Sequence, residues 1–361
     1  MLMNILWILL GVIALLWLVA RFHLGGQDLS VYDAPTGQRF APGRPAHPGV
    51  AASMARLNNY PEAKVKGLPR RQLLAARRRH FDHMFDDHVF DASFTRIDLD
   101  GTHGEWVMAP GADPSRRMLY LHGGGFMLGS ARSHRPITSR MSALTGGAVL
   151  AIDYRLMPEH KRREGIEDCR HAYRWMLEHG PSEASPAQAV FVAGDSAGAN
   201  LTLCLLAWAR DQGLRAANAA VVLAPPTDST FSSPSIRSNR ASDLMLGPAL
   251  GFIASVPRSL LLWLSWLHSG IRPNDPIASP IHGDLSRLPP TLVHVSETEM
   301  LLDDARRYVN RAQAAGSSAQ LQTWDNTLHV WHIFDPELPE AGEAYAEIGK
   351  FLDGVAPRPA P

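Results

Sequence analysis

Beyond residue 95, short apolar segments alternate with segments whose apolar positions recur at helical spacing. The short segments indicate strands at 105–109, 117–121, 148–154, 189–193, 219–224, 291–295 and 321–324. The longer ones indicate helices at 135–144, 166–178, 197–210, 303–315 and 342–352. Because continuous apolar strands separated by helices are typical of parallel sheets, the pattern predicts an α/β fold with helices on both faces of a mostly parallel sheet.

The chain begins with an uncharged apolar stretch, and its first charged side chain is Arg21. The residues from Leu2 to Ala20 suffice to cross a hydrocarbon core of about 30 Å. A cleaved signal peptide would have basic residues before the apolar run and a small-x-small cleavage site, and this segment has neither. We therefore expect residues 1–22 to form an uncleaved single-pass membrane anchor. The basic residues that follow it favour a cytoplasmic location for the rest of the chain.

Composition excludes some functions. The chain has 361 residues, of which 35 are Lys or Arg and 35 are Asp or Glu. It therefore has no excess of positive charge that would favour binding to nucleic acid. The two cysteines, Cys169 and Cys204, fall in partly apolar segments and are predicted to be buried free thiols. The histidines within 80–91 have no recognised metal-ligand spacing, so no metal site is predicted there.

The segment around Ser196 is the strongest candidate for chemistry. An apolar run at 190–193 leads into Gly194-Asp-Ser-Ala-Gly198, and a long apolar run follows. This order predicts a strand, a sharp turn and a helix, with the serine at the apex of the turn. Glycines two residues before and after Ser196 suit a turn too tight for Cβ atoms. The turn would place the serine hydroxyl at a helix N-terminus, where backbone N–H groups favour negative charge.

A second glycine-rich loop precedes this turn. The short strand 119–121 runs into His122-Gly-Gly-Gly125-Phe126. Consecutive glycines let the backbone approach a ligand closely and leave N–H groups exposed, as an oxyanion hole requires. A phosphate-binding loop would have Lys-Ser or Lys-Thr after the glycines, and the chain has neither there.

Three motifs together, His122-Gly-Gly-Gly-Phe126, Asp153-Tyr-Arg-Leu-Met-Pro-Glu159-His160 and Gly194-Asp-Ser-Ala-Gly198, resemble the hormone-sensitive-lipase-like esterases of the α/β-hydrolase superfamily. These are also called bacterial family IV carboxylesterases, and the resemblance covers roughly residues 95–355. It implies that Ser196 is the nucleophile. It also implies an oxyanion hole on the loop from His122 to Gly125, with N–H donors from Gly123, Gly124 and Ala197. Supporting roles are implied for Asp195 and for an ion pair between Arg155 and Glu159.

A serine nucleophile needs a base and a group that orients the base. The superfamily order is Ser, then Asp or Glu, then His. His329 occupies the family's base position, and His332 is the alternative. The expected acid motif, Asp-Pro-Leu-x-Asp, is absent after the strand at 291–295; a gapless match places Glu299 at the acid position. The residues that compete for this role are Glu297, Thr298 and Asp303.

The resemblance also implies a helical cap built from two segments. The expected organisation is an anchor at 1–22, a linker and N-terminal cap segment at 23–95, a catalytic core at 96–225 and 281–354, a cap insertion at 226–280 and a tail at 355–361. The apolar run 259–267 in the insertion is predicted either to pack within the cap, to line an acyl site or to dip into a bilayer surface.

The expected function is therefore hydrolysis of carboxylic esters with short to medium acyl chains. The predicted substrate is a small-molecule ester, with no metal, organic cofactor or nucleic acid, and a homodimer is the candidate assembly. Two alternatives use the same fold. An amidase or deacetylase would share the triad, and a catalytically silent ligand-binding member would be expected to lack the histidine at 329.

Overall fold

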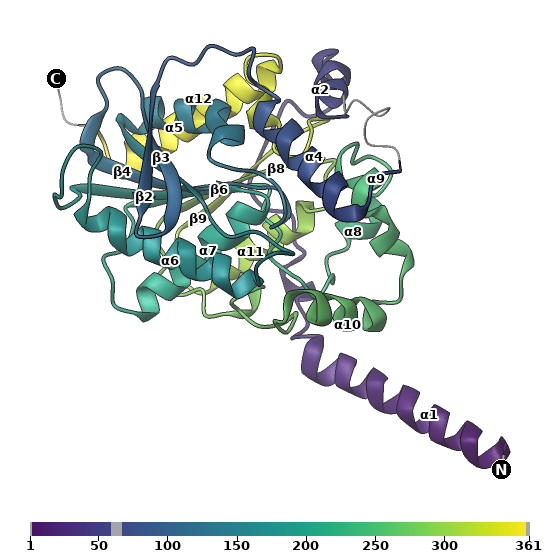
Figure 1. Cartoon of the computed structure of the whole chain (residues 1–361). Helices are drawn as coiled ribbons and strands as arrows, with labels where there is room; N and C mark the ends of the chain where they lie inside the picture. Colours follow the sequence, from purple (N-terminus) through teal and green to yellow (C-terminus); the bar gives the residue numbers. More distant parts are fainter. Residues whose placement is uncertain (1, 59–66, 359–361) are drawn as a thin grey trace.

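The computed structural model describes residues 2–58 and 67–358, which form one α/β body with a long helix projecting from it (Figure 1). Its sheet has the strand order β1-β9-β8-β7-β6-β4-β5-β3-β2. Only the β2–β3 and β3–β5 pairs are antiparallel. The strands are β1 (Gln38–Phe40), β2 (Ser93–Leu99), β3 (Thr102–Met108), β4 (Asp113–Leu121), β5 (Gly147–Asp153), β6 (Ala189–Asp195), β7 (Ala219–Leu223), β8 (Thr291–Ser296) and β9 (Ala319–Trp324).

Helices cover both faces of the sheet, because its central strands are apolar on both sides. All residues of β6, β7 and β8 are buried. One apolar core lies beneath α6, α7 and α11, and a second lies beneath α5 and α12. The covering helices are α5 (Arg135–Thr145), α6 (Arg162–Glu178), α7 (Ala197–Asp211), α11 (Leu302–Ala314) and α12 (Pro339–Val355).

The predicted mostly parallel α/β fold is confirmed, and each predicted strand and helix is present with small shifts at its ends. Two edge strands were not predicted. β1 lies within the expected linker and pairs in parallel with β9. β2 crosses the expected boundary between residues 95 and 96 and pairs with β3. Both cysteines are free and buried, as predicted.

Two segments distant in sequence lie outside the sheet, in the regions where the resemblance implies a cap (Figure 1). The N-terminal segment contributes α2 (Gly49–Asn58) and α4 (Arg70–His83). The insertion after β7 contributes α8 (Ser235–Ser238), α9 (Leu246–Leu250) and α10 (Arg258–Ser269). The first segment lies between β1 and β2 along the chain, and the second lies between β7 and β8.

The apolar N-terminus forms helix α1 (Leu2–Val19), which continues as one π-helical turn from Ala20 to Leu24. Within the described ranges, this is the one helix long and apolar enough to cross a membrane, and very little of it is buried. Ala20 and Leu24 at its base are wholly buried. The helix is therefore exposed along its length and fixed to the protein body at its end.

The expected ion pair between Arg155 and Glu159 does not form. The guanidinium of Arg155 donates to the buried carboxylate of Asp168, with a closest N–O distance of 2.7 Å, and the backbone N–H of Arg155 donates to the same carboxylate. Glu159 instead pairs with Arg78 of α4 at 2.8 Å. The two residues therefore make contacts with different elements. Arg155 binds Asp168 of α6, and Glu159 binds Arg78 of α4 in the N-terminal segment.

These two ion pairs should contribute unequally to stability. Asp168→Asn should lower the free energy of unfolding by about 2 kcal/mol. The reason is that an amide replaces the buried carboxylate that accepts both the guanidinium and the backbone N–H of Arg155. Glu159→Gln should lower it by less than about 1 kcal/mol, because the Glu159 side chain is 52% exposed. Urea unfolding in detergent, followed by tryptophan fluorescence, measures both. Equal effects, or a larger effect of Glu159→Gln, would contradict this ranking.

Candidate active site

Ser196 lies at the turn between β6 and α7, where the backbone is strained. Its φ is 49° and its ψ is −119°, a conformation that a residue with a side chain rarely adopts. Gly198 makes the turn sterically feasible, since a Cβ there would lie 1.8 Å from the carbonyl oxygen of Leu121. The end of β4 and the start of α7 therefore pack backbone against backbone, and the serine hydroxyl is presented at the carboxyl end of the sheet.

The predicted triad residues lie together, although they come from three separate loops. Nε2 of His329 is 2.8 Å from Oγ of Ser196, and Nδ1 of His329 forms a short hydrogen bond with Oε1 of Glu299. His329 and Glu299 are almost wholly buried. A carboxylate at Nδ1 assigns the proton to that nitrogen, so Nε2 is free to accept the serine proton.

The side chains that competed for these roles are engaged elsewhere. Nε2 of His332 contacts Nδ1 of the buried His294 at 3.1 Å. The Asp303 carboxylate accepts the N–H of Ser235 at 2.8 Å and also pairs with Arg306. Glu297 lies 3.9 Å from Arg306, and the Thr298 hydroxyl donates to the carbonyl of Thr327 at 3.2 Å. None of these contacts involves His329.

The loop that carries Glu299 is held by the cap insertion. Oε2 of Glu299 accepts the N–H of Ser296 at 2.7 Å, so each carboxylate oxygen has a donor. The side-chain amide of Asn239 donates to the carbonyls of Glu297 and Glu299, and the Asp243 carboxylate accepts the N–H of Met300 at 2.9 Å. Sequence reasoning missed Asn239 and Asp243, because both lie in an insertion without a recognisable motif.

Burial and mutual attraction have opposite effects on the pKa values of His329 and Glu299. Burial alone would lower the pKa of His329, but the charge and hydrogen bond of Glu299 outweigh it and hold the pKa above its ordinary value. Burial raises the pKa of Glu299, and the attraction of His329 opposes this rise. The imidazole is thus made a stronger base by the carboxylate beside it.

The glycine loop after β4 differs in one detail from the expected oxyanion hole. The N–H of Gly123 donates to Oδ1 of Asp195 at 3.0 Å, so this donor is already occupied within the protein. Within residues 2–58 and 67–358, the N–H groups of Gly124, Gly125 and Ala197 have no hydrogen-bond acceptor. We therefore assign the candidate oxyanion donors to Gly124, Gly125 and Ala197 instead of Gly123, Gly124 and Ala197.

The carboxylate of Asp195 is the partner of the glycine loop. Its carboxylate also accepts the hydroxyl of Tyr120 at 2.6 Å and lies 3.3 Å from Nε2 of His134. Burial would raise the pKa of Asp195, but His134 and the hydrogen-bond donors hold it below its ordinary value. His122 stacks on Tyr154, and burial lowers its pKa to about 3, so its ring is a neutral structural element.

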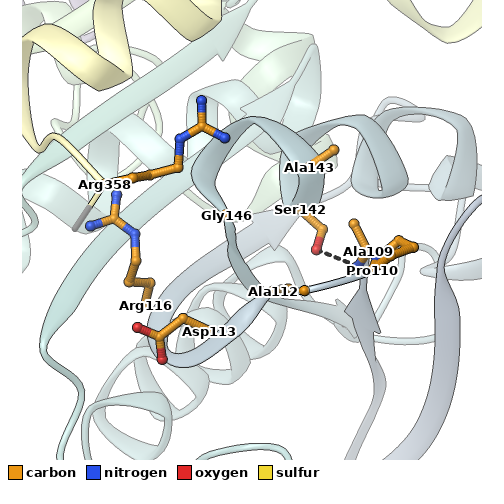
Figure 2. A pocket seen from close by; sticks show the side chains of 10 residues that line it. Ala109, Pro110, Ala112, Asp113, Arg116, Ser142, Ala143, Gly146 and Arg358 are labelled. Carbon is orange, nitrogen blue, oxygen red and sulfur yellow. Dashed lines mark hydrogen bonds between the residues drawn. The ribbon is translucent and has the colours of Figure 1, made fainter. Parts of the chain in front are cut away.

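A cavity of about 310 Å³ lies beside the segment 109–116 and is not lined by any of these residues (Figure 2). It is lined by residues at the start of β4, including Asp113 and Arg116, whereas the glycine loop follows the end of that strand. The guanidinium of Arg116 is occupied by the backbone carbonyls of Thr145 and Ala356. Since ligands of parallel α/β sheets bind at the carboxyl ends of the strands, we do not assign substrate binding to this cavity. Nor does any group of three or more potential metal ligands occur in the part of the chain that the structure describes.

Comparison with known proteins agrees with this geometry. Residues 118–333, more than half of the chain, match the family described as the alpha/beta hydrolase fold, and the chain belongs to it. An "Acetyl-hydrolase" of Streptomyces hygroscopicus is 39% identical over 248 residues, covering 69% of this chain and 78% of the relative. The "Carboxylesterase/phospholipase LipF" of Mycobacterium tuberculosis is 34% identical over 269 residues, covering 72% and 68%.

Solved structures identify the branch of the family. An esterase from the bacterial hormone-sensitive lipase family superposes with a TM-score of 0.71 at 35% identity, covering 86% of this chain and 99% of that chain. The esterase EstE5, in crystals soaked with p-nitrophenyl butyrate, superposes with a TM-score of 0.69 at 33% identity and the same coverage. The resemblance to the hormone-sensitive-lipase-like esterases is confirmed.

The contacts of Glu299 predict which carboxylate variant loses activity. Glu299→Gln should keep the fold but lower kcat by at least about 10²-fold, because an amide favours the wrong imidazole tautomer and does not stabilise imidazolium. Glu297→Gln and Asp303→Asn serve as matched controls and should retain most of the turnover. Side-by-side kcat values, with circular dichroism to check folding, measure this. A near-normal rate for Glu299→Gln beside an inactive control would contradict the assignment.

The same pair predicts a shift in pH dependence. Only neutral His329 accepts the serine proton, so kcat/KM should fall as pH falls through a pKa that Glu299 holds above 6.5. In Glu299→Gln the raising influence of the carboxylate is lost while burial remains, so the acid limb should move to lower pH. In Glu297→Gln it should stay in place. A pH–rate profile of all three proteins tests this, and an unmoved limb in Glu299→Gln would contradict it.

Proposed function

We propose that this chain hydrolyses carboxylic esters by an acyl-enzyme mechanism in which Ser196 is the nucleophile, His329 the general base and acid, and Glu299 the orienting carboxylate. His329 carries the proposal, because its two ring nitrogens face Ser196 and Glu299 in the arrangement that this chemistry requires. The relatives support the coarser statement, that the chain is an enzyme of the carboxylesterase and acetyl-hydrolase class.

The mechanism has two matching halves. As Oγ of Ser196 bonds to the ester carbonyl carbon, its proton passes to Nε2 of His329, and the carbonyl oxygen becomes an oxyanion. The N–H groups of Gly124, Gly125 and Ala197 stabilise that charge. The C–O bond to the alcohol then breaks, and His329 returns the proton to the leaving oxygen. Water repeats the sequence on the acyl-enzyme, releasing the carboxylic acid and restoring Ser196.

The acyl chain is proposed to be short to medium in length. The solved relative soaked with p-nitrophenyl butyrate and the acetyl-hydrolase relative support this choice. An amidase or deacetylase would use the same triad, and it is distinguished from an esterase by cleaving amides faster than esters. A catalytically silent member would have no use for the buried His329–Glu299 pair. The candidate homodimer stays a prediction.

Ser196→Ala should abolish ester hydrolysis and leave the fold intact, because it removes the only atom proposed to attack the carbonyl. The residual rate should be about 10³- to 10⁴-fold above the uncatalysed rate, which reflects the oxyanion hole and binding. The measurement is kcat/KM on matched p-nitrophenyl esters of increasing chain length and on the corresponding anilides. Wild-type turnover by Ser196→Ala would contradict the mechanism. Faster anilide than ester cleavage would favour the amidase, and a preference for long-chain esters would contradict the acyl-length proposal.

We also propose that α1 is an uncleaved membrane anchor. Its length, its exposed apolar surface and the lack of charge before Arg21 support a membrane span. The burial of Ala20 and Leu24 against the protein body supports retention, because cleavage after residue 20 would remove a packed side chain. The catalytic core is proposed to lie on the cytoplasmic side, because basic residues follow the helix and none precedes it.

The full-length protein should remain in the membrane fraction after an alkaline carbonate wash, whereas a chain beginning at Gln27 should be released and remain active. The reason is that a helix of this length buries its apolar surface only within a bilayer. Membrane fractionation with an esterase assay measures both outcomes. Release of the intact full-length chain by carbonate would contradict a spanning anchor.

A further inference from the structure

Helix α10 is apolar on two faces, although only one of them packs against the protein. Leu261 and Leu262 are buried. On another face, Leu260, Leu264 and Leu267 are 50%, 48% and 76% exposed. These three leucines recur at i, i+4 and i+7, so they form one continuous stripe along the helix. A solvated cap helix would have polar residues at these positions. The stripe is therefore a candidate interaction surface that residues 2–58 and 67–358 leave uncovered.

The base of α1 is attached directly to this helix. Ala20 and Leu24 form a buried cluster with Leu262, against which Trp263 and Trp266 pack. The indole N–H of Trp263 donates to the backbone carbonyl of Leu16 at 3.2 Å. Figure 1 shows α10 beside the point where α1 leaves the body. The exposed stripe of α10 and the exposed surface of α1 therefore belong to adjoining helices.

Polar contacts fix the same junction. The guanidinium of Arg258, at the start of α10, donates to the carbonyl of Gly25 and to the hydroxyl of Thr230. The side-chain amide of Asn274, after α10, donates to the carbonyl of His23. Bonds on both sides of α10 thus hold it against the segment that follows α1. The position of α1 in a membrane would therefore determine where α10 lies.

Helix geometry gives that position. Leu16 lies about 21 Å along the helix axis from Leu2, at about 1.5 Å per residue. A hydrocarbon core is about 30 Å thick. With Leu2 at the far edge, Leu16 would lie about 9 Å inside the near edge of the hydrocarbon core. Trp263, bonded to Leu16, would then lie within the depth of about 5–10 Å to which interfacial helices bury their apolar face. The stripe on the same helix would be at the depth of the boundary between head groups and acyl chains.

The charge around α10 matches a lipid head-group region. No acidic residue occurs before Asp28, and none occurs between Asp243 and Asp275. Exposed basic or titratable side chains lie on both segments, at Arg21, His268 and Arg272. Anionic head groups attract such side chains, and the absence of acids removes the opposing repulsion. A partner with an acidic or zwitterionic surface above an apolar interior fits both the charges and the stripe.

We propose that the face of α10 formed by Leu260, Leu264 and Leu267 is a lipid-contact surface, which lies in the boundary between head groups and acyl chains of the bilayer that α1 spans. This inference rests on the proposed anchor. The cap is thereby held on the membrane, and ester substrates dissolved in the bilayer reach it without crossing bulk water. The substrate class that follows is short-acyl esters of lipophilic alcohols.

A fluorophore at residue 267 tests this contact in the full-length protein. Leu267→Cys and the control Val89→Cys are labelled with an environment-sensitive dye; both positions are exposed, and the native cysteines are buried. The labelled proteins are reconstituted into phosphatidylcholine–phosphatidylglycerol vesicles. Lipids with a nitroxide near the head group report contact with the bilayer, and iodide reports contact with water. Alkaline carbonate resistance is measured on the same samples.

The proposal predicts strong nitroxide quenching and weak iodide quenching at residue 267, and the reverse at residue 89. Protection of residue 267 from both quenchers would mean that protein, such as a second copy, covers the stripe, and would overturn the proposal. Iodide quenching alone at residue 267 in carbonate-resistant protein would overturn the lipid contact but leave the anchor intact. Extraction by carbonate would overturn the anchor and the lipid contact together, while the esterase assay in detergent would still report on the triad.

A paired substitution tests the consequence for substrates. In the Leu264→Asp/Leu267→Asp double variant, kcat/KM on water-soluble p-nitrophenyl acetate should stay within about twofold of wild type, because neither side chain touches the triad. Hydrolysis of a vesicle-dissolved butyrate ester of a long-chain alcohol should fall at least about fivefold, because interfacial binding scales with buried apolar area. The control Val89→Asp should change neither rate. Equal rates of wild type and double variant on the vesicle-dissolved ester would overturn delivery through the bilayer.

Discussion

The approach of the β4 end to the turn at Ser196 is the constraint on which the active site depends. It requires glycine at residue 198, because no side-chain atom fits between that residue and the carbonyl of Leu121. The same approach brings Gly123 within hydrogen-bond distance of Asp195. Consequently the N–H groups of Gly124 and Gly125 are left without an acceptor in the described protein, beside that of Ala197. The strained serine and the proposed oxyanion donors therefore lie on either side of one close backbone contact.

The cap supports the chemistry through the backbone of the acid loop. Asn239 and Asp243 bind the carbonyls and N–H groups on both sides of Glu299, so the insertion helps hold the carboxylate against His329. Farther along the insertion, α10 is bonded to the base of α1. The insertion thus contacts both the loop of Glu299 and the helix that we propose as the anchor.

Much of the fold could be predicted from the sequence, because continuous apolar strands and the glycine spacing around Ser196 carry strong local signals, whereas His329 and Glu299 were placed as triad candidates by the family resemblance. Strand β1 was missed because it is a three-residue edge strand with a polar sequence, Gln38-Arg39-Phe40, and depends on pairing with β9. The partner of Arg155 was also missed. Asp168 is thirteen positions away on α6, and nearby charges in sequence suggested Glu159.

The oxyanion donors show the same limit of sequence reasoning. Three consecutive glycines reveal exposed N–H groups, but only the packing of the loop on Asp195 shows which of them is already occupied. Asn239 lies in an insertion whose sequence has no motif, and it gains its role only when the cap folds back on the acid loop. Tertiary contacts of this kind leave no periodic pattern in the chain.

The most direct test of the account is a crystal structure of the protein inactivated by an alkyl phosphonate, which places a tetrahedral centre with a negatively charged oxygen in the active site. The account predicts a covalent bond from phosphorus to Oγ of Ser196. It also predicts that the phosphonyl oxygen accepts the N–H groups of Gly124, Gly125 and Ala197, while Gly123 still donates to Asp195. Phosphorus on another residue, or an oxygen bonded by Gly123 in place of Gly125, would contradict it.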